Sequence, residues 1–152
     1  MVRLISSKIR RGKIFQVVVM YNKYIMEKYT YIPGVCNIGP DEIKKRKIGG
    51  WSGLIITIIF WGAFFIFTIP KEWALLIFFP VMMSAVGFLQ AYMQFCVYFG
   101  FANLFNFGDV GKTDSVSQAE YRKQDRRKAW KILTYAFLIS IVVMFVVYKS
   151  IL

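Results

Sequence analysis

The sequence predicts an all-α integral membrane protein with three transmembrane helices, arranged as a hairpin of helices one and two followed by a long third helix. Three uncharged stretches predict this fold, at residues 48–70, 73–105 and 132–148. A helix needs about 20 predominantly apolar residues to cross a bilayer. The composition agrees, because 57% of the 152 residues are hydrophobic, whereas soluble domains are about 45–50% apolar.

The charge is strongly positive, with 20 Lys and Arg against 8 Asp and Glu, a net charge of +12. In membrane proteins basic residues gather in cytoplasmic segments and beside anionic headgroups. We therefore expect contact with anionic phospholipids and no binding of nucleic acid. The chain has no histidine, which removes the commonest general base and the main nitrogen ligand of zinc. We expect no metal and no cofactor.

Residues 1–48 are predicted to form a basic cytoplasmic or interfacial region ahead of a transmembrane domain at residues 49–152. Within this region, residues 14–32 show helical spacing of apolar side chains but are rich in β-branched and aromatic residues. The spacing favours an amphipathic helix lying at the membrane interface, and the composition favours a strand. Both interpretations stay open, with the helix preferred.

A short helix is expected to begin at Pro40, because proline suits the first helical position. Asp41 and Glu42 follow in its first turn and four basic residues come in its last turn, which is the order that the helix dipole favours. We expect the adjacent Gly49 and Gly50 to break or bend the chain before the first span.

The three spans are expected at about residues 51–69, 73–96 and 129–150. Lys71 and Glu72 would form a tight connection between spans one and two, and Pro80 should kink span two. The third span would continue a helix that begins after residue 117. Residues 97–107 are best interpreted as an interfacial segment, with a re-entrant loop or a continuation of span two as alternatives.

Basic residues are distributed very unequally between the two predicted sides of the membrane. Residues 1–48 and 106–131 together carry 18 Lys and Arg, whereas Lys71 and Lys149 are the only two on the other side. The positive-inside rule therefore predicts a cytoplasmic N-terminus and a C-terminus on the opposite side. The membrane would be a bacterial inner membrane or an organellar inner membrane.

A stripe of small and polar residues is predicted along one face of span two. Small residues let helices approach closely, and glutamine can form hydrogen bonds between helices. We interpret the stripe as a helix-packing face, and alternatively as the lining of a pore or small-ligand pocket. Its members are Ser84, Gly87, Gln90, Ala91, Gln94 and Tyr98.

Two basic clusters flank spans one and three, and they are candidate docking sites for anionic lipid or an acidic partner. They comprise Lys44, Lys45, Arg46 and Lys47, and Arg122, Lys123, Arg126, Arg127 and Lys128. Cys36 lies in a loop near the first cluster, where positive charge would favour its thiolate. A structural role is the first interpretation of Cys36, and acylation or reactivity is the alternative.

No acid, base or nucleophile pattern predicts catalysis. No Asp, Glu, Lys or Arg falls within a span core, whereas such residues mark pumps and ion-coupled carriers. The leading hypothesis is a non-catalytic accessory or structural subunit of a larger membrane protein complex, with other membrane protein subunits as partners. The alternative hypothesis is a small homo-oligomeric channel or carrier lined by the polar residues of span two.

Overall fold

The computed structural model describes residues 16, 20, 30–67, 69–108 and 110–151, and the chain divides into two units, Met1–Thr30 and Tyr31–Leu152. Most of the predicted helix or strand over residues 14–32 falls outside the described residues. The second unit is mainly helical. Its elements are α2 (Pro40–Ile66), the 3-10 helix η1 (Lys71–Ile77), α3 (Phe78–Tyr92), α4 (Val97–Ala102), β1 (Leu104–Phe105), β2 (Asp114–Ser115) and α5 (Ala119–Ile151).

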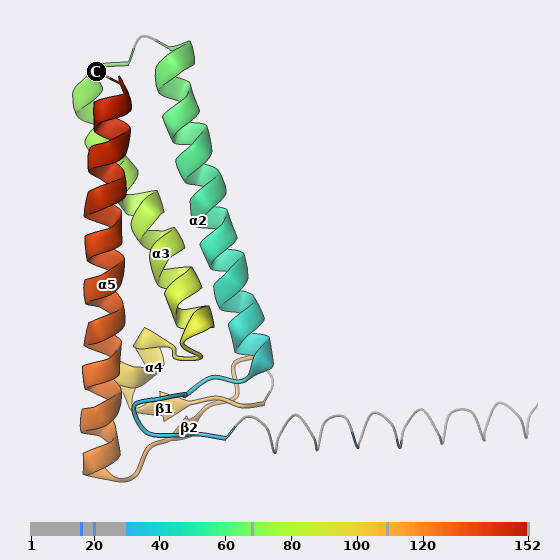
Figure 1. Cartoon of the computed structure of the whole chain (residues 1–152). Helices are drawn as coiled ribbons and strands as arrows, with labels where there is room; N and C mark the ends of the chain where they lie inside the picture. Colours follow the sequence, from blue (N-terminus) through green and yellow to red (C-terminus); the bar gives the residue numbers. More distant parts are fainter. Residues whose placement is uncertain (1–15, 17–19, 21–29, 68, 109, 152) are drawn as a thin grey trace, which may run out of the picture. The chain divides into compact units, whose positions relative to one another are not determined.

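Three helical segments are long and apolar enough to cross a membrane: α2, the combined η1 and α3, and α5. This confirms the prediction of three helices of membrane-spanning length. The helix α3 packs against both α2 and α5, whereas α2 and α5 make few contacts with each other. Figure 1 shows that α2 and α5 begin at the same end of the unit and that α3 runs in the opposite direction.

The helix α2 is continuous from Pro40 to Ile66, so Gly49 and Gly50 do not break the chain, which was one of the two predicted outcomes. It begins at Pro40 with Asp41 and Glu42 in its first turn, as expected. A glycine inside a helix costs only about 1 kcal/mol relative to alanine. The close packing of Gly50 against α3 accounts for a glycine at this position without any break in the helix.

The two helices meet through their backbones at a crossing point between Gly50 of α2 and Gly87 of α3. A Cβ atom added to Gly87 would lie 2.5 Å from the nitrogen and 2.7 Å from the Cα of Gly50. One turn further along, a Cβ on Gly53 would lie 2.6 Å from the nitrogen of Ser84. Only glycine permits such an approach, and the buried stripe of α2 consists of Glu42, Gly50, Gly53 and Thr57.

Pro80 lies in the first turn of α3, directly after the 3-10 helix, and not two turns into a continuous α-helix as predicted. The chain enters α3 through η1, and α3 starts at Phe78. The first N–H groups of an α-helix have no acceptor within it, and a proline there removes no hydrogen bond. The change from 3-10 to α geometry therefore places Pro80 where it is tolerated.

The helix α3 ends at Tyr92, four residues before the predicted end of span two. Gln94 then adopts a left-handed backbone with φ of 51°, which costs a non-glycine residue about 1–2 kcal/mol. The reversed chain is held by the carbonyl of Gln94, which accepts a hydrogen bond from the Asn37 N–H at 3.1 Å. Residues 97–107 are consequently not a continuation of α3.

A small layer, which we call the end cap, covers the end of the unit where α2 and α5 begin (Figure 1). It consists of residues 31–39, 93–108 and 110–118. Strands β1 and β2 pair antiparallel, with Leu104 opposite Ser115, and an isolated parallel bridge joins Ile38 to Asn106. The end cap has an apolar core of Ile38, Cys96 and Phe99.

The helix α5 is a single 33-residue helix from Ala119 to Ile151, close to the predicted helix. Its buried residues recur every three, four or seven positions and form one seam, which is the pattern of a helix packed on one side. The seam comprises Asp125, Ala129, Ile132, Ala136, Ser140 and Val147. Near the end of α5, Val147 packs with Ile77 and Val81. Closer to its start, Ala129 and Ile132 pack with Phe95 of the end cap.

We predict that Gly87→Ala destabilises the fold, because its methyl group would collide with the backbone of Gly50 and with the Arg46 carbonyl oxygen at 2.9 Å. Overpacking of this kind costs about 1–3 kcal/mol. Thermal unfolding of the detergent-solubilised protein measures the change. The matched control is Gly62→Ala on α2, where the added Cβ meets no atom within 4 Å. Equal unfolding temperatures for the two variants would contradict the backbone crossing.

Candidate functional site

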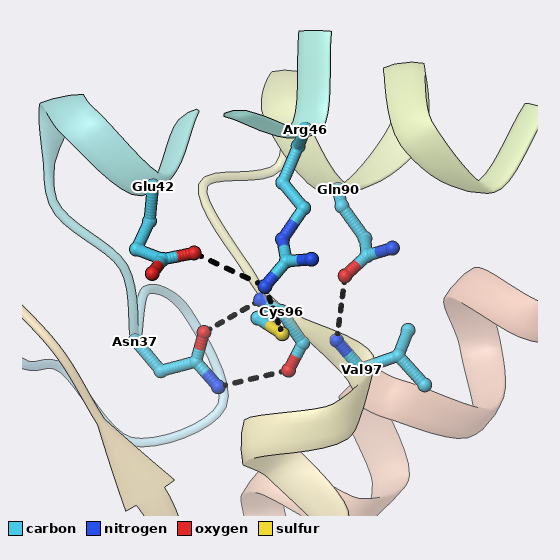
Figure 2. A network of polar contacts seen from close by, with 6 residues as sticks. All are labelled: Asn37, Glu42, Arg46, Gln90, Cys96 and Val97. Carbon is cyan, nitrogen blue, oxygen red and sulfur yellow. Dashed lines mark hydrogen bonds and ion pairs between the residues drawn. The ribbon is translucent and has the colours of Figure 1, made fainter. Parts of the chain in front are cut away.

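A buried pairing between the Asn37 side chain and the Cys96 backbone lies at the centre of the end cap (Figure 2). The Cys96 N–H donates to Oδ1 of Asn37 at 2.6 Å, and Nδ2 of Asn37 donates to the Cys96 carbonyl at 3.1 Å. Both residues are fully buried. The amide side chain thus bonds to Cys96 as a neighbouring β-strand would.

The main chain of Asn37 extends the same network in two further directions. Its N–H donates to the Gln94 carbonyl at 3.1 Å, and its carbonyl accepts from the Asn106 N–H at 3.0 Å. Asn37 therefore joins its own segment to residues 94–96 and to Asn106, which both lie far from it in the sequence. Buried polar groups need hydrogen-bond partners. Asn37 supplies such partners to the backbone of its neighbours, and its own polar groups are bonded in return.

Arg46 and Glu42, one helical turn apart on α2, form an ion pair that closes over Cys96 (Figure 2). Nη2 of Arg46 donates to Oε2 of Glu42 at 3.1 Å and to Sγ of Cys96 at 3.1 Å. The side chain of Glu42 is only 3% exposed and that of Arg46 is 23% exposed. A buried carboxylate requires such a partner, so Arg46 is needed for Glu42 to be tolerated.

The guanidinium of Arg46 retains unused hydrogen-bonding capacity. Both of its bonds use Nη2, and within the described part of the chain its Nε is buried without an acceptor. Its Cζ lies 6.0 Å from the centre of the Phe99 ring, a distance at which a cation and an aromatic face attract. Arg46 thus keeps one buried donor without an acceptor among the described residues.

Gln90, near the end of α3, accepts hydrogen bonds from the turn that follows this helix. Its Oε1 accepts a hydrogen bond from the Val97 N–H at 3.0 Å, and its carbonyl accepts from the Phe95 N–H at 3.0 Å. These bonds stabilise the start of α4. The side-chain oxygen of Gln90 is therefore occupied by the backbone.

A second buried polar cluster anchors the start of the unit to α5. Asp125, fully buried, accepts hydrogen bonds from the Tyr31 hydroxyl at 2.8 Å and from the Gly34 N–H at 2.7 Å. Burial, together with the hydrogen bond to Asp125, raises the pKa of Tyr31 above its ordinary value. The phenol therefore stays protonated and remains a donor.

Both cysteines are buried. Burial raises the pKa of the Cys36 thiol above its ordinary value, so the expectation that nearby positive charge favours the Cys36 thiolate is wrong. Burial likewise raises the pKa of Cys96, although backbone hydrogen bonds and the Arg46 charge oppose this shift. For Cys36 desolvation outweighs backbone hydrogen bonds, and for Cys96 it outweighs both such bonds and the Arg46 charge, because burial acts directly on the charged sulfur.

The structure divides the predicted stripe of span two into two groups. Ser84, Gly87, Gln90 and Ala91 are buried on α3. Gln94 and Tyr98 are exposed and lie beyond the end of that helix. A single helical face over the six residues is thus excluded, because the chain reverses at Gln94.

The two predicted basic clusters both lie at the end of the unit where α2 and α5 begin (Figure 1). In the first, Lys44, Lys45 and Lys47 are exposed and Arg46 is half-buried. In the second, Lys123, Arg126 and Arg127 are exposed and Lys128 is half-buried. Arg122 instead donates to the carbonyl oxygens of Val116 and Ser117 at 2.8 and 2.9 Å.

No sequence pattern predicted that Asn37, Glu42 and Asp125 are buried. The spacing of Glu42 and Arg46 could have revealed their ion pair, since residues four apart face each other on a helix.

Within the described residues, no three His, Cys, Asp or Glu side chains are placed to hold a metal ion. Comparison of the chain with protein-family models, with curated proteins and with solved structures finds no match.

We predict that Asn37→Asp lowers the free energy of unfolding by about 1–3 kcal/mol, the cost of an unsatisfied buried group. The carboxylate cannot donate to the Cys96 carbonyl, although its size is unchanged. Thermal unfolding in detergent measures the effect, with Gln118→Glu, at an exposed amide, as the control. A variant as stable as the parent would show that the pairing with Cys96 contributes little.

We also predict that Cys36 and Cys96 resist alkylation by a maleimide in the folded protein. A raised pKa leaves less thiolate at neutral pH, so the rate should rise only at a pH above that for a free thiol, whose pKa is about 8.5. Mass spectrometry should find both thiols labelled after denaturation in dodecyl sulfate. Rapid labelling of Cys36 in the folded protein at neutral pH would refute its burial.

Proposed function

We propose that this protein is a non-catalytic accessory subunit of a larger membrane protein complex. It would pack through its transmembrane helices. It would dock partners or anionic lipid through its basic end, by which we mean the end where α2 and α5 begin and where both basic clusters lie. The observation that carries this proposal is that polar and apolar side chains are used in different places. The buried polar groups described above bond to the chain itself, and the outer faces of the helices are apolar.

The outer faces of α2 and α5 carry many large exposed apolar side chains. On α2 these include Ile55, Ile58, Ile59, Phe65 and Ile66, and on α5 they include Leu138, Val142, Phe145 and Val146. An apolar groove of about 400 Å³, lined by residues such as Leu54, Phe88 and Val143, lies among α2, α3 and α5. Apolar surface of this extent fits lipid or neighbouring helices.

The basic end supports the proposed orientation. Because α2 and α5 begin at the same end of the unit (Figure 1), Lys44–Lys47 and Arg122–Lys128 would all face one side of the membrane. The positive-inside rule makes this the cytoplasmic side, or its equivalent in an organelle. The N-terminus would lie there, and the C-terminus would lie on the other side of a bacterial or organellar inner membrane.

The use of Gln90 argues against a pore lined by span two. Its side-chain oxygen accepts from the Val97 N–H, and Ser84 and Gly87 pack next to α2. A pore lining requires polar groups that are free to face water. The buried part of the stripe is instead engaged in holding the helices together, which favours the accessory role over the channel.

We predict that native mass spectrometry of the protein, extracted in mild detergent, finds a particle that contains other subunits in a fixed ratio to this chain. The apolar outer faces of α2 and α5 would pack against the helices of such subunits. A particle built only from copies of this chain would contradict the accessory role and favour a channel, which flux through reconstituted vesicles would then test.

The matched sample in the same experiment lacks residues 1–30, the first of the two units. If residues 1–30 bind a partner subunit, the shortened chain should lose that subunit or yield a particle that dissociates at lower collision energy. An unchanged particle would show that partners dock on other residues, while leaving the packing of the helices as the basis of the complex.

A further inference from the structure

We propose that a recess between the basic turn of α2 and the facing side of α3 binds one anionic phospholipid. Lys45 and Arg46 would hold its phosphate, and Met82, Met83 and Val86 would contact its acyl chain. This inference deepens the lipid-docking part of the proposed function. It does not require that the chain belongs to a complex.

The recess has a volume of about 300 Å³. Lys45, Arg46 and Gly49 line it from α2, and the two methionines and Val86 line it from α3. Gly49 leaves it open, since a Cβ at this position would meet no atom within 4 Å. The space equals that of roughly ten water molecules in the liquid, enough for a phosphate and the first carbons of a lipid.

The polar half of the recess carries the charge of Lys45 in excess of the ion pair between Arg46 and Glu42. No acidic side chain lines it, and Glu42 is buried and already paired with Nη2 of Arg46. Among the described residues Lys45 has no ion-pair partner, and Nη1 of Arg46 has no hydrogen-bond acceptor. Arginine and lysine donors of this kind form charge-assisted hydrogen bonds with phosphate oxygens.

The apolar half of the recess points in the direction that an acyl chain requires. Gly87 lies level with the backbone of Arg46 and Gly50, and α3 runs opposite to α2 (Figure 1). Residues that precede Gly87 therefore lie farther from the end cap than the basic turn does. Met83 and Met82 are consequently placed on the apolar side of the phosphate position.

This combination selects a phospholipid over a soluble phosphate compound. A free phosphate would gain nothing from the methionines, whereas thioether side chains adapt readily to irregular apolar ligands. The recess lies where the basic turn of α2 meets its long apolar run, the level at which a headgroup meets hydrocarbon in a bilayer. The charge and the apolar wall thus match the two halves of one lipid.

The test uses the purified full-length chain in detergent, titrated with phosphatidylglycerol and, separately, with phosphatidylcholine of the same acyl chains. Native mass spectrometry counts the bound lipids. We expect one phosphatidylglycerol to be retained in preference to phosphatidylcholine. Equal retention of the two lipids would overturn the proposed recognition of an anionic headgroup.

Two variants locate the site. Lys45→Gln should lower the affinity for phosphatidylglycerol about fivefold, which is the typical contribution of one basic residue to the attraction of anionic lipid. Lys47→Gln, an exposed lysine outside the recess, is its control for the loss of one charge. Gly49→Leu should fill the recess and abolish the bound lipid, and Gly62→Leu is its control at another open position of α2.

Equal losses for Lys45→Gln and Lys47→Gln would overturn the site in favour of a diffuse charge effect, as would an unaffected Gly49→Leu. Competition by soluble glycerol phosphate at a concentration matched to the lipid would overturn the role of the apolar wall. Because every measurement uses the isolated chain, failure here would leave the subunit composition of any complex untouched. The absence of a complex would likewise leave the lipid result standing.

Discussion

The close approach of α2 and α3 at Gly50 and Gly87 is the constraint on which the rest of the unit depends. It brings the first turns of α2 next to the end of α3, and so it places Arg46 and Glu42 over the turn that contains Cys96. Helices of this apolarity gain little from exchanging lipid contacts for helix contacts. Close backbone packing therefore has to provide much of the attraction.

The end cap follows from that crossing. The chain leaves α3 at Tyr92, reverses at Gln94 and must satisfy the polar backbone groups that the reversal exposes. Asn37 supplies two of the missing partners through its amide and two through its main chain. Asp125 does the same for the segment that contains Gly34. Buried polar side chains thus serve the backbone in this layer, where water would otherwise be required.

The recess beside Arg46 is a consequence of the same geometry. The glycines that permit the crossing also leave space on one flank of it, because Gly49 points into an open region while Gly50 packs against α3. The ion pair with Glu42 fixes one edge of the guanidinium, while its buried Nε has no acceptor among the described residues. A single turn of α2 therefore combines a structural cation with an unfilled apolar space.

The sequence by itself determined the three membrane-length helices, the start of α2 at Pro40 and the gathering of basic residues before spans one and three. Each of these depends on composition and spacing within one segment, such as the apolar run of α2. Only the tertiary structure decided that Gly50 packs where a break or bend was expected, that α3 stops at Tyr92, and that Asn37 and Asp125 are buried. The partners of those two side chains lie 59 and more than 90 residues away, and no local pattern records contacts at such separations.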